Sequence, residues 1–235
     1  MQTKFIVVTG GSKGIGRAIL HRFASEGFAL ITCAREEAPL QGLRAELAEK
    51  YVATLHYQTA DLSQKEEVRA FADFVQQQTN RIEVLVNNAG VFWPGAVLTE
   101  PEGNLEYMLQ ANLLSAYHLT RALVPCMRPF GQGHIFNMCS IASLVAYPNG
   151  GSYAITKFAL LGLSKVLREE LKSEGLRVTS VLPGATYTAS WEGVEVPPER
   201  LMPAEDIAEM VYATYALSTR SVVEELLIRP QLGDL

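Results

Sequence analysis

The sequence predicts a single-domain α/β fold in which a seven-stranded parallel sheet is doubly wound, with helices on both faces. Short apolar runs alternate along the chain with longer segments of helical periodicity, which is the pattern of repeated βαβ units. The apolar runs are continuous, as expected for strands that are covered on both faces. All 235 residues follow this pattern without an internal repeat or a linker, and one α/β domain commonly has this length. We therefore interpret residues 1–235 as one domain.

The strands are predicted from apolar runs that are rich in β-branched residues. The predicted strands are residues 4–9, 28–34, 52–60, 82–88, 134–140, 176–183 and 222–230. Parallel strands joined by right-handed crossovers all end at the same edge of the sheet. We therefore expect a ligand site along that edge, near the point where the strand order reverses.

The helices are predicted from apolar residues that recur every three or four positions. The predicted helices are residues 15–25, 40–50, 63–79, 105–127, 153–173 and 204–217. The third helix has a start signal of its own, because Ser63 and Glu66 have the spacing of an N-terminal capping box.

Composition and charge exclude several classes of function. The net charge is −5 and there is no basic run, so neither nucleic acid nor an anionic membrane is an expected partner. No apolar run reaches the roughly 18 residues of a membrane span, and the first residues lack the pattern of a signal peptide, so we expect a cytoplasmic protein. Cys33, Cys126 and Cys139 form no CxxC pair, which is typical of buried thiols in a reducing compartment. The four histidines have no metal-ligand spacing, so no metal site is expected.

A glycine-rich turn, T-G-G-S-K-G-I-G at residues 9–16, joins the first predicted strand to the first helix. Glycines let the backbone approach a pyrophosphate closely, and the N-terminus of a helix favours its negative charge. The alternative is a tight turn that binds nothing, but a strand before the turn and a helix after it favour dinucleotide binding. The predicted contacts in this loop are Gly10, Ser12, Lys13, Gly14, Ile15 and Gly16.

The end of the second strand indicates which dinucleotide is bound. A carboxylate there would hold the ribose 2′-hydroxyl of NAD and repel a 2′-phosphate. This position is Ala34, Arg35 follows it, and Lys13 lies in the neighbouring loop. Two cations suit a 2′-phosphate, which Arg can bind with two hydrogen bonds, so NADP(H) is the predicted cofactor. The alternatives are that both are ordinary surface charges, or that Arg35 pairs with Glu36 or Glu37.

Further motifs follow in order over nearly the whole chain. They are Asp61-Leu62, the N-N-A-G motif at residues 87–90, Asn112, Ser140, Tyr153, Lys157 and Pro183-Gly184. With these motifs and its T-G-x-x-x-G-I-G turn, the chain resembles the short-chain dehydrogenase/reductase family. Within that family it resembles the members that prefer NADP(H). The resemblance implies a Rossmann-like fold in which Asp61 binds the adenine amino group and residues 87–90 line the adenosine.

The same resemblance implies that Thr188 meets the pyrophosphate or the carboxamide of the cofactor, where the alternative is a hydroxyl that bonds its own loop. Tyr153 and Lys157 are implied to contact the cofactor as well as the substrate. The other cofactor contacts that the resemblance adds are Asp61, Leu62, Asn88, Ala89, Gly90, Pro183, Gly184, Thr186 and Thr188.

Tyr153 and Lys157 are the predicted centre of catalysis. They are four residues apart near the start of a predicted helix, so they lie on one face of it. A nearby ammonium and the positive end of the helix both favour the phenolate, so we expect the pKa of Tyr153 to be lowered. An isolated pair of this kind is common on helices, and its meaning depends on the residues around it.

Ser140 and Asn112 complete the predicted catalytic set. Ser140 ends the fifth strand and could bond a substrate carbonyl oxygen, although Ser143 in the same loop is a competing candidate. Asn112 lies inside a predicted helix, where asparagine is unfavourable, and the resemblance implies that it holds a water that relays protons to Lys157. The resulting hypothesis is hydride transfer between NADP(H) and a carbonyl, with Tyr153 as the proton donor. The alternative is a non-catalytic NADP(H)-binding sensor or interaction protein on the same fold.

The resemblance also implies a substrate lid over residues 185–202 and an oligomer. Five residues are candidates for the substrate pocket or for ordinary packing, namely Trp93, Ala142, Tyr147, Tyr187 and Trp191. The chain ends sooner after its last predicted strand than is usual in the family, where a longer C-terminal stretch helps to build tetramers. We expect a homodimer or a homotetramer in which the helices at 105–127 and 153–173 pair across a two-fold axis.

Overall fold

The computed structural model of the chain describes residues 3–188 and 196–233. Within these residues, seven strands form one parallel sheet in the order β3-β2-β1-β4-β5-β6-β7. The strand order reverses between β1 and β4, which confirms the predicted doubly wound fold. The strands are β1 (Phe5–Thr9), β2 (Ala29–Ala34), β3 (Leu55–Thr59), β4 (Val84–Asn87), β5 (Gly133–Met138), β6 (Leu176–Pro183) and β7 (Glu225–Ile228).

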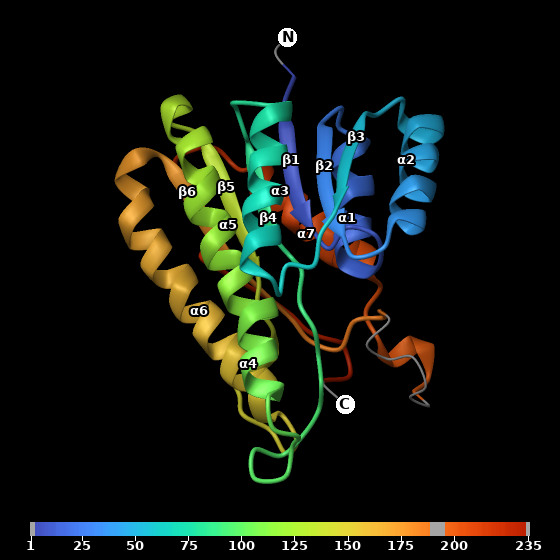
Figure 1. Ribbon diagram of the computed structural model, residues 1–235, viewed down its shortest axis with the longest axis vertical. Helices are drawn as coiled ribbons and strands as arrows, with labels where there is room; N and C mark the ends of the chain where they lie inside the picture. Colours follow the sequence, from blue (N-terminus) through green and yellow to red (C-terminus); the bar gives the residue numbers. More distant parts are fainter. Residues whose placement is uncertain (1–2, 189–195, 234–235) are drawn as a thin grey trace.

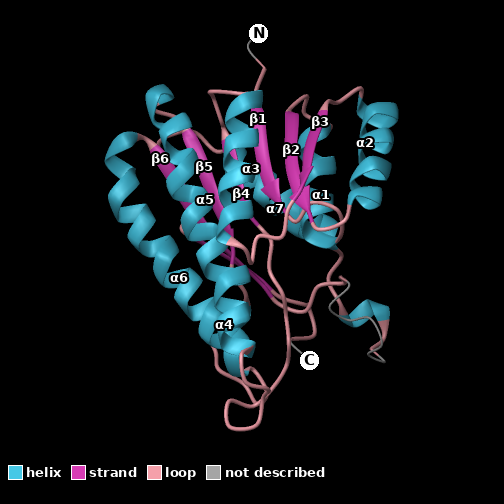
Figure 2. Ribbon diagram, viewed as in Figure 1, coloured by secondary structure: helices cyan, strands magenta, loops and turns pink. Residues whose placement is uncertain are grey.

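Helices cover both faces of the sheet (Figures 1 and 2). One face is covered by α1 (Gly14–Ala24), α2 (Glu37–Tyr51) and α7 (Ala204–Ala216). The other is covered by α3 (Lys65–Gln78), α5 (Ser115–Leu123) and α6 (Gly151–Leu171). The helix α4 (Asn104–Leu109) continues α5 beyond the sheet through the π-helical turn η1 (Gln110–Leu114). Short 3-10 helices in the described residues are η2 (Val124–Cys126), η3 (Arg128–Phe130), η4 (Ile141–Ser143), η5 (Lys172–Glu174) and η7 (Pro198–Arg200).

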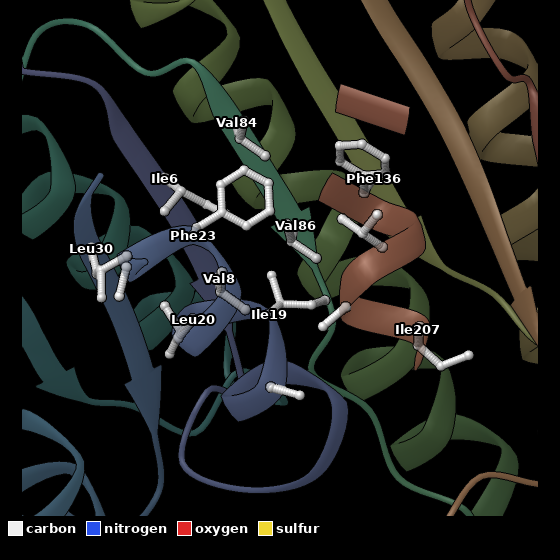
Figure 3. Packing of buried hydrophobic residues seen from close by; sticks show 14 of the residues in the cluster. Ile6, Val8, Ile19, Leu20, Phe23, Leu30, Val84, Val86, Phe136 and Ile207 are labelled. Carbon is white, nitrogen blue, oxygen red and sulfur yellow. The ribbon is translucent and has the colours of Figure 1, made fainter. Parts of the chain in front are cut away.

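The continuous apolar strands are explained by a core on each side of the sheet. Ile6 and Val8 of β1 point toward the α1 and α7 layer, where Phe23 is fully buried and contacts Tyr212 edge to face at 5.3 Å between ring centroids (Figure 3). Val7, between them, points toward the other layer and joins the cluster around Phe71. Phe→Ala substitutions at such buried sites cost about 3–5 kcal/mol, so each layer contributes substantially to stability.

Two predicted boundaries are wrong for local reasons. The strand predicted at 52–60 is shorter in the structure, where β3 begins at Leu55. The reason is that helix α2 extends to Tyr51, and Val52 is its C-cap with a left-handed φ of 55°. The predicted capping box of Ser63 and Glu66 is not formed. Helix α3 begins two residues later, at Lys65, and Glu67 accepts a hydrogen bond from the Asp61 N–H at 2.6 Å.

The described residues were also compared with the requirements of a membrane span and of a metal site. Among the described residues, no helix is both long and apolar enough to cross a membrane. That part of the chain also has no group of three His, Cys, Asp or Glu side chains placed to hold a metal ion. Cys33 and Cys139 are buried free thiols and Cys126 is a half-buried one.

Candidate active site

A cavity of about 860 Å³ lies along the carboxyl edge of the sheet, where β1, β2, β4, β5 and β6 end. It is of the size that holds a bound small molecule in many proteins. Most of the predicted site residues line it. They are Gly10, Ser12, Lys13, Gly14, Ile15, Arg35, Asp61, Leu62, Asn88, Ala89, Gly90, Ser140, Tyr153, Lys157, Pro183, Gly184, Thr186 and Thr188. The predicted residues Gly16 and Asn112 lie behind this lining.

The glycine loop lines one end of the cavity. Gly10 adopts a left-handed φ of 67°, and its N–H donates to the Cys33 carbonyl at 2.9 Å. A Cβ on Gly16 would lie 2.5 Å from the side-chain nitrogen of Asn88, so close packing against the N-N-A-G motif requires glycine there. Within the described residues, Lys13 at the N-cap makes no side-chain capping bond, so the first N–H groups of α1 are left for another acceptor. This arrangement fits a phosphate group.

The N-N-A-G motif supports the loop from the neighbouring strand. The Thr9 hydroxyl accepts hydrogen bonds from the N–H groups of Asn88 and Ala89, both at 2.9 Å. The Asn88 side chain donates to the Thr9 carbonyl at 2.8 Å. Asn87 is buried and bonds Thr120 and Asn137, so it braces the interior while the next three residues line the cavity.

The end of β2 has no carboxylate at the strand's last position. Ala34 and Arg35 line the cavity there, and Arg35 is exposed. In the described part of the chain Arg35 forms no ion pair, and the Glu37 carboxylate instead accepts from the Gln41 amide at 2.9 Å. Glu36 also lines the cavity, one position beyond Arg35.

Tyr153 and Lys157 lie in the first two turns of α6, beside the end of β5. The Lys157 ammonium is buried, donates to the Met138 carbonyl at 2.7 Å and lies 5.6 Å from the centroid of the Tyr153 ring. Burial lowers the pKa of Lys157 to about 8. The expected lowering of the Tyr153 pKa is wrong for this structure. Burial raises that pKa, and a hydrogen bond with the Ser140 hydroxyl offsets the rise only in part.

Ser140 is fixed in place by a small capping box. Its hydroxyl accepts from the Ala142 N–H at 3.2 Å, and the Ser143 hydroxyl accepts from the Ser140 N–H at 3.2 Å. Ser143 is almost fully buried and lies outside the cavity lining, so of the two candidate serines Ser140 is the one that a ligand can reach.

Asn112 lies in the π-helical turn η1 and not in a regular helix. Its carbonyl oxygen accepts from the Val91 N–H at 2.7 Å, and its amide donates to the Val91 carbonyl and to the Thr156 hydroxyl, each at 3.0 Å. A Cβ on Gly90 would lie 3.0 Å from the Asn112 oxygen and 3.8 Å from the Lys157 ammonium, so Gly90 separates these two side chains. The single long helix predicted for residues 105–127 is therefore interrupted at this residue.

The predicted pocket residues divide into two groups. Ala142 and Tyr147 line the cavity, whereas Trp93 stacks on Tyr107 at 4.7 Å between centroids and Tyr187 is 65% exposed. Trp191 lies outside the described residues, as does much of the predicted lid. The parts of the predicted lid that the structure describes lie side by side, because the Tyr187 N–H donates a hydrogen bond to the Met202 carbonyl at 2.8 Å.

Sequence reasoning missed several residues that line the cavity. Phe92 lies against Tyr153 edge to face at 4.8 Å between centroids, and its place two residues after the N-N-A-G motif was the available signal. Arg229 follows the last strand, and a charged residue directly after any parallel strand lies at the ligand edge. Other residues of the lining that were not predicted include Tyr107, Ile141 and Val145.

Comparisons with known proteins agree with this fold. A family model described as short chain dehydrogenase matches residues 4–196. A sepiapterin reductase from Chlorobaculum tepidum is 34% identical over 238 residues, covering 98% of this chain and 97% of that protein. An alcohol dehydrogenase from Thermococcus sibiricus, solved with 5-hydroxy-NADP, is similar in structure with a TM-score of 0.93, 28% identity and coverage of 100% and 99%. L-sorbose reductase from Gluconobacter frateurii, solved with NADPH and L-sorbose, has a TM-score of 0.88, 26% identity and coverage of 98% and 96%.

Proposed function

Because the chain belongs to the short-chain dehydrogenase family, we propose that it reduces a carbonyl compound to the alcohol with NADPH. It is an oxidoreductase, and a carbonyl and its secondary alcohol are the two forms of the proposed substrate. The observation that carries the proposal is that Ser140, Tyr153 and Lys157 line the same cavity as the glycine loop. A binding protein without catalysis has no need of these three side chains together, so the non-catalytic alternative is not favoured.

NADPH, when bound, supplies the hydride that is added to the carbonyl carbon. Tyr153 gives its hydroxyl proton to the carbonyl oxygen, and Ser140 donates a hydrogen bond to the same oxygen. The raised pKa of Tyr153 keeps the hydroxyl protonated at neutral pH, and the protonated form is the one that a reduction consumes. Lys157 holds the ribose hydroxyls and presents positive charge to the phenolate that forms.

Asn112 is proposed to support the return of a proton to Tyr153 through Lys157. Both N–H donors of its side chain are already used by Val91 and Thr156, so the amide itself is not free to hold a water by donation. A π-helical turn leaves a backbone carbonyl without its usual helical partner. We therefore propose that a backbone carbonyl of η1 binds the water of the relay. The Asn112 side chain stabilises the π-helical turn that exposes this carbonyl.

The preference for NADP(H) is proposed to rest on Arg35 and Lys13. Both cations line the cavity at the end where β2 and the glycine loop meet. Arg35 has no ion-pair partner in the described residues, so its guanidinium is available to a 2′-phosphate. Similar structures solved with NADPH or an NADP derivative support this assignment.

The substrate end of the cavity favours a compact carbonyl compound with an apolar body. The cavity lining includes the aromatic and aliphatic residues Phe92, Tyr107, Ile141, Val145 and Tyr147, of which Phe92 packs on the Tyr153 ring. Such a lining binds by burial of apolar surface, with the hydroxyls of Ser140 and Tyr153 orienting the carbonyl oxygen.

A homodimer or homotetramer in the cytoplasm is the proposed working form. Exposed apolar side chains on α5 and α6 supply the surface for self-association, and Ile155 and Phe158 are each 44% exposed. Burial raises the pKa of the Cys33 thiol to about 12, so this free thiol is unreactive, as suits a protein with three unpaired cysteines in a reducing compartment.

The test is a screen of aldehydes, ketones, diketones, quinones and pterins for loss of NADPH absorbance, with NADH in parallel. We expect turnover of at least one apolar carbonyl class and faster turnover with NADPH than with NADH. Binding of NADPH with no turnover of any class would contradict the proposal and favour a sensor.

A further inference from the structure

The loop between β4 and α4 reaches across to the start of α6. In Figure 1 the loop hangs below the carboxyl edge of the sheet, beside the chain that leads into α6. Within it, the N–H groups of Thr99 and Glu100 donate to the Ala96 carbonyl at 2.9 and 2.8 Å. The Gly95 N–H donates to the Asn149 carbonyl at 2.9 Å, which ties this turn to the residues before α6.

The turn also lies directly against the first residue of α6. Gly151 has a φ of 38°, and a Cβ there would lie 2.2 Å from the Gly95 carbonyl oxygen. Because any other residue would collide with backbone, the contact between loop and helix leaves little freedom in how α6 begins.

Glu100 caps the first turn of α6, although it lies 52 residues before Ser152 in the sequence. Its carboxylate accepts a short hydrogen bond from the Ser152 hydroxyl and a longer one, 3.4 Å, from the Ser152 N–H. Within the described residues the helix has no side-chain cap of its own, since its N-cap is Gly150. A carboxylate at this end satisfies an unpaired N–H and lies at the positive end of the helix dipole.

Ser152 is the residue immediately before Tyr153, and its side chain is almost fully buried. The same loop supplies Phe92, whose ring packs edge to face on the Tyr153 ring. The loop therefore contacts the tyrosine ring itself and, through Glu100, the backbone that carries it. The Tyr153 hydroxyl itself bonds the Ser140 side chain, which stands on a different element.

We propose that Glu100 is a positioning residue that holds the first turn of α6 so that Tyr153 is aligned with Ser140. This inference rests on the proposed function, because it assigns Tyr153 as the proton donor. Glu100 does not line the cavity, so it acts through Ser152 and not on the substrate or the cofactor.

The experiment compares Glu100→Ala with Glu102→Ala, a matched change in the same loop. Glu102 is exposed and has no hydrogen bond or ion pair among the described residues. For Glu100→Ala we expect kcat to fall about 10- to 100-fold, the order of effect that a small misplacement of a reacting group produces. The Kd for NADPH should not change, and the deuterium isotope effect on kcat should rise because hydride and proton transfer become slower. Glu102→Ala should behave as the parent enzyme does.

Two further variants separate positioning from general stability. Glu100→Gln keeps an acceptor oxygen for the Ser152 N–H and a group that can bond its hydroxyl, so it should restore most of the rate. Ser152→Ala should lower kcat, and the double variant with Glu100→Ala should be no slower than Glu100→Ala alone, since both changes break the same contact. Equal kcat in Glu100→Ala and Glu102→Ala would overturn the proposal, as would a lower kcat with an unchanged isotope effect.

Amide hydrogen exchange distinguishes failure of this proposal from failure of the proposed function. The Ala154 N–H donates to the Gly150 carbonyl at 2.9 Å in the first turn of α6. Its exchange should be faster in Glu100→Ala than in the parent protein, whether or not a substrate has been found. Unchanged exchange would show that Glu100 does not hold this turn. A parent protein without turnover, or a Tyr153→Phe variant with full turnover, would instead refute the proposed function.

Discussion

At the scale of single residues, the environments of Lys157 and Tyr153 have complementary effects. Burial disfavours the charged form of each, so the pKa of the lysine falls and that of the tyrosine rises. Tyr153 is thereby kept as a neutral acid, and the charge that forms when it donates its proton is met by a nearby ammonium. The sequence predicted the pair but the wrong direction for the tyrosine pKa, because burial depends on residues such as Phe92 that pack around the ring.

Replacement of Arg35 with alanine tests the cofactor preference at this scale. The loss of charge-assisted hydrogen bonds to a 2′-phosphate costs about 1.5–3 kcal/mol. We therefore expect the Kd for NADPH to rise about 10- to 100-fold, measured by fluorescence titration, while the Kd for NADH stays nearly the same.

Arg44→Ala is the matched control for this change. Arg44 is an exposed arginine of α2 that does not line the cavity, so neither Kd should change. An equal loss of affinity for NADPH and NADH in Arg35→Ala would show that the guanidinium does not bind the 2′-phosphate.

At the scale of elements, the pattern of apolar residues predicted the strands and helices well and their irregularities poorly. β1 and β2 were found within one residue of their ends because a strand buried on both faces leaves a clear apolar run. The π-helical turn at Asn112 could not be found in this way. It depends on hydrogen bonds to Val91 and Thr156, which are 21 and 44 residues away in the chain.

The interruption of the helix at η1 makes a prediction about Asn112→Ala. The change removes three hydrogen bonds and leaves the Val91 N–H and carbonyl without their partner. Each buried polar group left unpaired costs about 1–3 kcal/mol. Since 1 kcal/mol corresponds to a shift of about 2–4 °C in a domain of this size, we expect the Tm to fall by several degrees and kcat to fall with it.

Thr120→Val serves as a comparison for Asn112→Ala, because it also removes a buried hydrogen bond but lies on α5 away from the cavity. It should lower the Tm and leave kcat close to that of the parent enzyme. If Asn112→Ala kept the parent Tm and kcat, the assignment of η1 to a structural and relay role would be wrong.

At the scale of the whole molecule, the doubly wound topology brings distant motifs to one edge. The ends of β1, β2, β4, β5 and β6 open onto one cavity, although their residues span most of the chain. The order of motifs in the sequence was sufficient to predict this convergence. The loop contact of Glu100 with α6 was not predictable, since neither residue type nor spacing indicates which surface loop reaches a helix terminus.

The outer face of α6 predicts self-association. Ile155, Phe158 and Val166 are exposed at helical spacing, and Gly162 between them has open space where a side chain would lie. This stripe allows two helices to approach closely. We expect Phe158→Glu to lower the mass measured by light scattering toward that of a monomer, because it places a charge in the paired surface.

Met210→Glu is the control for that measurement. Met210 is 41% exposed on α7, close to the 44% of Phe158, but it lies on the opposite layer of the molecule. The mass of the Met210→Glu variant measured by light scattering should equal that of the parent protein. A parent protein that is already a monomer would refute the proposed oligomer.

The proposed chemistry is tested most directly by Tyr153→Phe, which removes one oxygen atom and leaves the ring against Phe92. Turnover of the substrate found in the screen and binding of NADPH are measured on the same preparation. Loss of a general acid lowers rates by about 10²–10⁴-fold, so kcat should fall by at least this order while the Kd for NADPH is unchanged. Turnover near that of the parent enzyme, with NADPH still bound, would contradict the assignment of Tyr153 as the proton donor.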